Sequence, residues 1–302
     1  MLFAAAWLLA ALLAACGQRP TPAAPRVLAD DAVTIGAFDF PESELLARLY
    51  GTALEDAGFR VDLQLGLGSR ELVEPALQRG LIEVLPEYAG SALAFLGGDA
   101  ARPSGAMATH DALVAAARAR GLVVLDAAPA QDRNGFVTTA ETARLYGLQK
   151  VSDLASYADQ MVLGGPPECP SRPLCLLGLG SVYGLSFEGF VSLDAGGPLT
   201  VAALRIGQID VGLLFTTDGR IDTEGFVLLR DDRLLQPAEN VTPIVRPEAL
   251  ATFGPSLSDL LNAVSAQLTT ADLRTMNAQV AGGVASAAVA RAWLDAHVPG
   301  TG

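Results

Sequence analysis

The 302-residue chain has only two histidines, three cysteines and two tryptophans, which leaves few side chains for the common kinds of catalysis. It contains no Gly-x-Ser-x-Gly, no Walker-type loop, and no His-x-x-x-His or cysteine cluster with metal-ligand spacing. Gly66-Leu67-Gly68 and Gly178-Leu179-Gly180 both lack the third glycine of a dinucleotide-binding fingerprint. We therefore expect a protein that is not an enzyme and that uses no metal and no cofactor.

Basic residues are also scarce, since 20 Lys and Arg stand against 33 Asp and Glu, for a formal net charge of −13. An acidic surface repels phosphate backbones and anionic lipid headgroups, so the charge argues against nucleic acid and against peripheral membrane binding. After the first 16 residues, no run of 18 apolar residues is free of charge or repeated glycine. We expect the bulk of the chain to be soluble.

The N-terminal residues 1–16 carry no charge and end in Leu13-Ala14-Ala15-Cys16. A short apolar segment that ends in small residues predicts a secretory signal, here residues 1–15, because a spanning helix needs about 20 residues. The cysteine resembles that of a bacterial lipobox, which implies that Cys16 is lipidated and is the only membrane attachment. An ordinary signal with an incidental cysteine is the alternative. A proline-rich tether over residues 16–32 would then hold an extracytoplasmic protein at the membrane.

The other two cysteines, Cys169 and Cys175, are separated by Pro-Ser-Arg-Pro-Leu. In an oxidising compartment, two cysteines at such short spacing predict a disulfide. Closing so small a loop contributes only about 2 kcal/mol through chain entropy. We interpret the bond as a local staple that shapes the loop around Arg172.

Short apolar strands alternate with amphipathic helices, which predicts an α/β fold with mostly parallel sheets. The first lobe is expected to hold strands 33–36, 61–65, 82–85 (stopped by Pro86) and 123–126, and helices 42–57, 70–79 (capped by Ser69), 91–96 and 111–120. The second lobe is expected to hold strands 134–138, 161–164, 190–193 and 209–215, and helices 140–146, 154–157, 174–183 and 199–205. A polar return crossing at 216–219 would lead to strands 226–229 and 241–245 and helices 257–268 and 271–281 of the first lobe. The expected boundaries are therefore 33–133 and 219–302 for lobe I, and 134–218 for lobe II, with two crossings that act as a hinge.

Residues 76–88 (ALQRGLIEVLPEY) recur in outline at residues 203–215 (ALRIGQIDVGLLF). Both segments have the pattern of a helix end, a glycine stop, a short strand with one carboxylate, and a terminal aromatic ring. Ligands in open α/β sheets bind beyond the carboxyl ends of strands. The repeat therefore predicts that Tyr88 and Phe215 face one crevice from two similar lobes. Coincidence in a chain rich in Ala, Leu and Gly is the alternative.

Aromatic rings from two lobes can enclose a quaternary ammonium, whose methyl groups present diffuse positive charge to the ring faces. Each contact contributes about 2 kcal/mol at best, whereas micromolar binding needs about 8 kcal/mol, so other groups must hold the rest of the ligand. For Tyr88 and Phe215 the alternative is ordinary packing in the core.

The further candidates for ligand contact are Arg172 for a carboxylate, Ser69 and Arg70 at a helix N-terminus for an anionic group, Phe38 and Asp39 in the loop after the first strand, and the polar Thr216, Thr217 and Asp218. For Arg172 the alternative is a surface arginine without a ligand.

Several long stretches resemble the substrate-binding lipoproteins of bacterial glycine betaine/choline ABC importers. They are VTIGAFDFPES, GLGSRELVEPALQRGLIEVLPEYAGSAL, RNGFVTTAETARLYGLQKVSDLA, LDAGGPLTVAALRIGQIDVGLLFTTDG and LLQPAENVTPIVR, which span nearly all of residues 33–250. The resemblance implies a two-lobed type II periplasmic-binding-protein fold that closes like a Venus flytrap on a small solute. It also implies delivery of the solute, by what we expect to be a monomer, to an ABC permease with a cytoplasmic ATPase.

The resemblance further implies a tyrosine cage, of which this chain keeps one member. Tyr88 matches a cage position within PEYAG, Phe215 stands where a tyrosine often precedes the Thr216-Thr217-Asp218 element, and Asn134 stands where another cage tyrosine is expected. We therefore predict a receptor for a quaternary amine such as glycine betaine or choline. The alternatives are a same-fold receptor for another small solute, such as an amino acid, and a sensory lipoprotein without transport.

Overall fold

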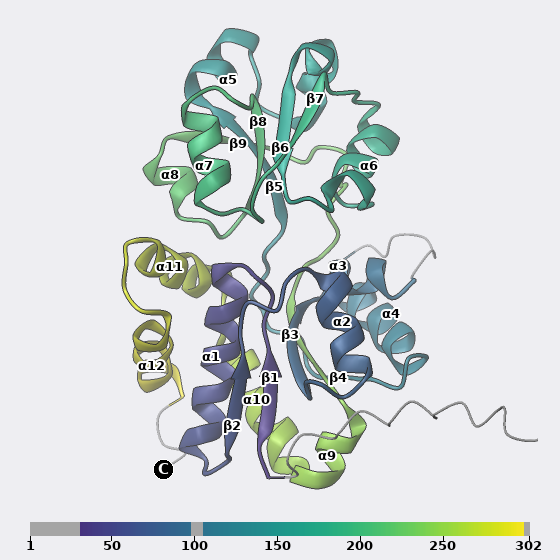
Figure 1. Ribbon diagram of the computed structural model, residues 1–302, viewed down its shortest axis with the longest axis vertical. Helices are drawn as coiled ribbons and strands as arrows, with labels where there is room; N and C mark the ends of the chain where they lie inside the picture. Colours follow the sequence, from purple (N-terminus) through teal and green to yellow (C-terminus); the bar gives the residue numbers. More distant parts are fainter. Residues whose placement is uncertain (1–30, 98–104, 299–302) are drawn as a thin grey trace, which may run out of the picture.

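The computed structural model describes residues 31–97 and 105–298 of the chain (Figure 1). These residues form two lobes, each built on a five-stranded sheet with helices on its faces, and two segments of chain run between the lobes. The predicted two-lobed α/β architecture is confirmed. The signal, the lipidation site Cys16 and most of the tether lie outside the described residues. No helix within the described ranges is long and apolar enough to cross a membrane.

The sheet of lobe I has the strand order β2-β1-β3-β10-β4, in which only β10 runs against the others. Its strands are β1 (Val33–Gly36), β2 (Val61–Gln64), β3 (Val84–Tyr88), β4 (Val123–Val124) and β10 (Val241–Val245). Its helices are α1 (Pro41–Asp56), α2 (Arg70–Gln78), α3 (Ala89–Phe95), α4 (Ala106–Arg118), α9 (Pro247–Phe253), α10 (Pro255–Gln267), α11 (Thr270–Ala281) and α12 (Ser286–His297).

The sheet of lobe II has the order β7-β6-β8-β5-β9, in which only β5 runs against the others. Its strands are β5 (Asn134–Thr139), β6 (Val162–Gly165), β7 (Gly189–Ser192), β8 (Val211–Phe215) and β9 (Phe226–Leu229). Its helices are α5 (Ala140–Tyr146), α6 (Leu176–Gly178), α7 (Pro198–Arg205) and α8 (Arg220–Thr223), with 3-10 turns η1 (Val151–Ser156), η2 (Ala158–Gln160) and η3 (Cys169–Ser171) and a π turn η4 (Leu179–Tyr183).

Helix α1 illustrates how the sequence sets the local fold. Pro41 opens the helix, where its missing N–H needs no partner. Leu45, Leu46 and Leu49 then return at helical spacing and are completely buried against the lobe I core. The N-terminus of α1 is thereby held at the side of the lobe that faces lobe II (Figure 1), where Glu42 becomes part of the contact between the lobes.

The repeated segments occupy equivalent places, since β3 and β8 are each the third strand of their sheet. The repeated carboxylates have the same structural role just before these strands. Glu83 accepts a hydrogen bond from the backbone N–H of Thr34 at 3.0 Å, and Asp210 accepts one from that of Val162 at 2.8 Å. Each carboxylate thus ties its strand to the neighbouring one, and the predicted internal repeat is confirmed.

Two predicted details of the sheets are wrong. Pro86 does not stop its strand, because it lies opposite Pro243 of β10, and β1 pairs with β3 only up to Val84. No partner at this position therefore requires the N–H that proline lacks. The residues 226–229 do not return to lobe I, because β9 pairs with β5 in the second sheet.

The second crossing therefore follows Leu229, not the polar residues 216–219. It runs antiparallel to the first crossing, with a bridge between Gln131 and Asn240. The N–H of Asp132 donates to the carbonyl of Glu239 at 3.1 Å, which joins the two crossings further. These two paired segments are the predicted hinge between the lobes.

The disulfide between Cys169 and Cys175 is present, with a sulfur–sulfur distance of 2.04 Å. The helix predicted for residues 174–183 is confirmed from Leu176 to Tyr183, where α6 continues directly into the π turn η4. Ser69 precedes α2 as predicted, but its side chain makes no capping bond to the backbone.

Candidate functional site

A cavity of about 260 Å³ lies between the lobes and is lined by residues of both. Lobe I contributes the loop after β1, the start of α2 and the end of β3, and lobe II contributes the disulfide loop and the end of β8. The lining includes eight of the predicted site residues, namely Phe38, Asp39, Ser69, Arg70, Tyr88, Asn134, Arg172 and Phe215. The carboxyl ends of β3 and β8 thus converge on one crevice, as the repeat predicted.

The aromatic wall of the cavity is built around Phe40, which the sequence analysis missed. The Phe40 ring lies 4.9 Å from that of Phe215 and 6.0 Å from that of Tyr88, measured between centroids. Phe38 also stacks on Phe40, at 5.9 Å between ring centroids. Phe40 and Phe215 stay partly exposed, whereas Phe38 and Tyr88 are buried. The cage therefore joins three phenylalanines to one tyrosine, with Phe40 between the rings of the two lobes.

The hydroxyl of Tyr88 points into a buried polar cluster. It donates to the Glu42 carboxylate at 2.8 Å, and the hydroxyl of Thr217 and the amide of Asn277 donate to the same carboxylate at 2.6 and 2.5 Å. Burial raises the pKa of Glu42, although these hydrogen bonds oppose the shift. Burial and the charge of Glu42 also raise the pKa of Tyr88, so its phenol stays a donor. The Tyr88 ring is thus held in one orientation at the cavity wall.

Asp132 lies in the first crossing and also lines the cavity. It accepts hydrogen bonds from the N–H of Thr217 at 3.1 Å and from the hydroxyl of Thr216 at 3.2 Å. Burial, followed by the charge of Glu42, raises the pKa of Asp132 well above its ordinary value. Two neighbouring buried carboxyl groups at the hinge therefore both bind protons more tightly than they would in water.

Arg70 is held by the protein itself. Its Nε and Nη2 donate to the two oxygens of Glu87 at 2.7 and 2.9 Å, a bidentate pair that is almost fully buried. The guanidinium also lies over the face of Phe38, 5.0 Å from the ring centroid. Arg70 therefore stiffens the aromatic wall.

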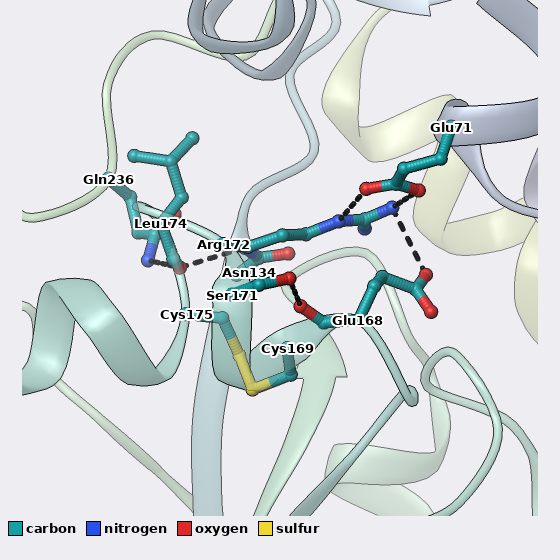
Figure 2. The surroundings of a disulfide bond; sticks show 9 residues. All are labelled: Glu71, Asn134, Glu168, Cys169, Ser171, Arg172, Leu174, Cys175 and Gln236. Carbon is teal, nitrogen blue, oxygen red and sulfur yellow. Dashed lines mark hydrogen bonds and ion pairs between the residues drawn. A yellow bond between two sulfur atoms is a disulfide. The ribbon is translucent and has the colours of Figure 1, made fainter.

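Arg172 extends from the disulfide loop of lobe II toward α2 of lobe I, as Figure 2 shows. Its Nε and Nη2 donate to the Glu71 carboxylate at 3.2 and 2.8 Å, and Nη2 also contacts Glu168 at 3.1 Å. On the other side of the loop, the amide of Asn134 donates to the Leu174 carbonyl at 3.1 Å. Asn134 thus anchors the disulfide loop to β5 at the cavity.

Thr216, Thr217 and Asp218 are not among the residues that line this cavity. Thr216 and Thr217 bond the hinge and Glu42, as described above. Asp218 forms an ion pair with Arg220 at 2.5 Å. Thr216 and Thr217 thus tie the end of β8 to the first crossing and to lobe I, whereas Asp218 bonds within lobe II.

Sequence reasoning also missed Glu42, Glu71 and Asn277. Phe40 lay in the same loop as two candidates, so an aromatic count of residues 37–41 would have found it. Glu42 and Asn277 are 235 residues apart, and Glu71 and Arg172 are 101 apart, so no local pattern links either pair.

The paired crossings, the two similar lobes and the aromatic cavity between them define a two-lobed solute-binding protein. The model of one family, described as the substrate binding domain of ABC-type glycine betaine transport system, matches residues 31–296. The chain belongs to this family. It is therefore an extracytoplasmic substrate-binding protein of an ABC transporter, which implies a small-molecule solute and a permease with its ATPase as partners.

Known proteins agree with this assignment over most of their length. A glycine-betaine-binding protein of Pseudomonas aeruginosa is 29% identical over 261 residues, which cover 83% of this chain and 82% of the relative. The carnitine transport binding protein OpuCC of Listeria monocytogenes is 26% identical with the same coverage. A crystal structure described as a glycine betaine/carnitine/choline ABC transporter superposes with a TM-score of 0.68 at 25% identity, covering 88% of this chain and 98% of that chain.

Proposed function

We propose that the cavity captures a quaternary amine, such as glycine betaine or choline, for import. The observation that carries this proposal is the convergence of Phe40, Tyr88 and Phe215 from both lobes on one cavity. Two or three desolvated cation–π contacts at about 2 kcal/mol each supply about 4–6 of the roughly 8 kcal/mol that micromolar binding requires. Asp39, together with Glu71 and Glu168, which share the single guanidinium of Arg172, supplies further attraction for a cation. The names of the relatives, which bind glycine betaine or carnitine, support the same class of ligand.

In this proposal the lobes close about the paired crossings and bring Phe215 onto the ligand from the side opposite Tyr88. The closed form then delivers the solute to the permease. Cys16, acylated after removal of residues 1–15, tethers the monomeric receptor to the membrane and is its only membrane attachment. The protein performs no catalysis of its own.

Isothermal titration calorimetry of the mature protein tests the ligand, with glycine betaine, choline, carnitine, proline betaine and common amino acids as probes. We expect heat from at least one quaternary amine and none from the amino acids. Tyr88→Ala and Phe215→Ala should each lower the affinity for that ligand tenfold or more, while the circular dichroism spectrum stays unchanged. A response to an amino acid alone would assign the receptor to another solute. Wild-type affinity in either variant would overturn the shared cage.

A further inference from the structure

The two arginines of the cavity are both occupied by carboxylates of the protein. Glu87 takes the Nε and Nη2 donors of Arg70, and Glu71 takes the same edge of Arg172. The Arg172 pair spans the lobes, because Glu71 lies in α2 and Arg172 follows η3. A guanidinium edge binds one carboxylate in the bidentate mode, so the Nε–Nη2 edge of each arginine is already filled by the protein.

A ligand carboxylate would compete directly with Glu71 for Arg172. Glu71, Glu168 and Arg172 all line the cavity, and Figure 2 shows both carboxylates turned toward the one guanidinium. Burial alone would raise the pKa of Glu71, but the hydrogen bonds from Arg172 and Ser69 outweigh it and lower this pKa to about 2. Glu71 is therefore ionised at neutral pH. A ligand carboxylate that approaches Arg172 meets two like charges already bound there.

The rest of the lining adds one exposed carboxylate, Asp39, and the described lining residues include no lysine. Glu239 and Asp132 also line the cavity, but burial raises the pKa of both, so they contribute less negative charge. A ligand with a single positive charge is attracted by this surface. A zwitterion brings a carboxylate for which neither Arg70 nor Arg172 has a free Nε–Nη2 edge.

Resting on the proposed function, we propose that Glu71 determines which quaternary amine the protein prefers. By filling the Arg172 edge, it favours a cationic alcohol such as choline and disfavours carboxylated ligands such as glycine betaine and carnitine. The Glu71 carboxylate thus occupies the position on Arg172 that the carboxylate of a zwitterionic ligand would take. Removing it exposes Arg172 and moves the preference toward the zwitterions.

The test is calorimetry of choline and glycine betaine with wild type, Glu71→Gln and Glu71→Ala. We expect wild type to bind choline at least tenfold more tightly than glycine betaine. Glu71→Gln should move the ratio of the two dissociation constants toward glycine betaine by tenfold or more, and Glu71→Ala by at least as much. The double variant Glu71→Ala/Arg172→Gln should lose this gain, because the exposed guanidinium is then gone.

Glu248→Gln is the matched control, since Glu248 also pairs with an arginine, Arg246, at 2.8 Å but lies outside the cavity lining. It removes the same charge and should leave the ratio unchanged. An unchanged ratio in both Glu71 variants, or equal weakening of both ligands, would overturn the inference and leave the proposed function standing. A wild type that binds glycine betaine more tightly than choline would likewise overturn the inference and leave the proposed function standing. Silence of wild type toward every quaternary amine would overturn the proposed function as well.

Discussion

The hydroxyl of Thr217, just after β8 of lobe II, donates a hydrogen bond of 2.6 Å to the carboxylate of Glu42 in α1 of lobe I. Both side chains are buried. The same carboxylate accepts from Tyr88, which lines the cavity. The contact between the lobes and the aromatic wall therefore share one acceptor, the Glu42 carboxylate. A substitution that alters the Thr217 contact thus also alters the hydrogen bonding of Tyr88.

Thr217→Val keeps the shape of the side chain and removes its donor. The Glu42 carboxylate then loses one of its buried partners, which costs about 1–3 kcal/mol in the free energy of unfolding. Urea denaturation followed by circular dichroism measures the loss. Thr223→Val is the control, because the Thr223 hydroxyl bonds only to the Gly219 carbonyl at 3.3 Å on the surface, and it should change stability by less than about 0.5 kcal/mol. Equal effects of the two variants would show that the Glu42 bond contributes little.

Stability should fall as pH rises from about 5 to about 8. Burial, followed by the charge of Glu87, raises the pKa of Glu74 to about 8, and burial raises that of Glu239 to about 7. Each group has an ordinary pKa of 4.5 when unfolded, so between these values the folded protein holds a proton that the unfolded chain has released. The stabilisation from each group is complete below pH 4.5 and is lost as the pH rises toward its folded pKa.

Glu74→Gln removes one such proton and should flatten the dependence. A single group contributes at most about 1.4 kcal/mol per pH unit to the slope. Urea midpoints of wild type and Glu74→Gln at pH 5, 6, 7 and 8 measure the difference, which should grow with pH in favour of the variant. The control Glu248→Gln should keep the wild-type slope, because hydrogen bonds of the Glu248 backbone and of Arg246 lower the pKa of Glu248 and its titration ends below this window. Parallel curves for wild type and Glu74→Gln would contradict the prediction.

The disulfide can be tested by the double variant Cys169→Ser/Cys175→Ser. Loss of the closed loop should cost about 2 kcal/mol in the free energy of unfolding. The variant should also have a lower affinity for the ligand, because the loop carries Arg172 and is hydrogen-bonded to Asn134 through the Leu174 carbonyl. Dithiothreitol should reproduce both effects in wild type and change nothing in the variant. A reduced wild type with unaltered affinity would mean that other contacts hold the loop.

The sequence predicted those parts of the site that rest on local pattern. Tyr88 and Phe215 follow from a strand pattern that recurs within each lobe, and both line the cavity. The partners of Glu42 and Arg172 come from elements far apart in the chain, and only the packing of the lobes brings them together. The prediction that residues 226–229 return to lobe I is wrong for a similar reason. The polar residues 216–219 have the composition of a crossing, but Thr216 and Thr217 are held by Asp132 and Glu42, and the chain continues in lobe II.

Gly196 offers a final test of the cage. Its φ is +66°, and a Cβ at this position would lie 2.9 Å from the Phe215 ring. Gly196→Ala should therefore displace Phe215 and lower the affinity for the quaternary amine tenfold or more, as measured by calorimetry. Gly207 has nearly the same φ of +68° but open space around it. Gly207→Ala should thus incur the same backbone strain of about 1 kcal/mol without loss of affinity. Because strain is common to both variants, a difference in binding isolates the ring, and equal affinities would exclude Phe215 from the ligand contact.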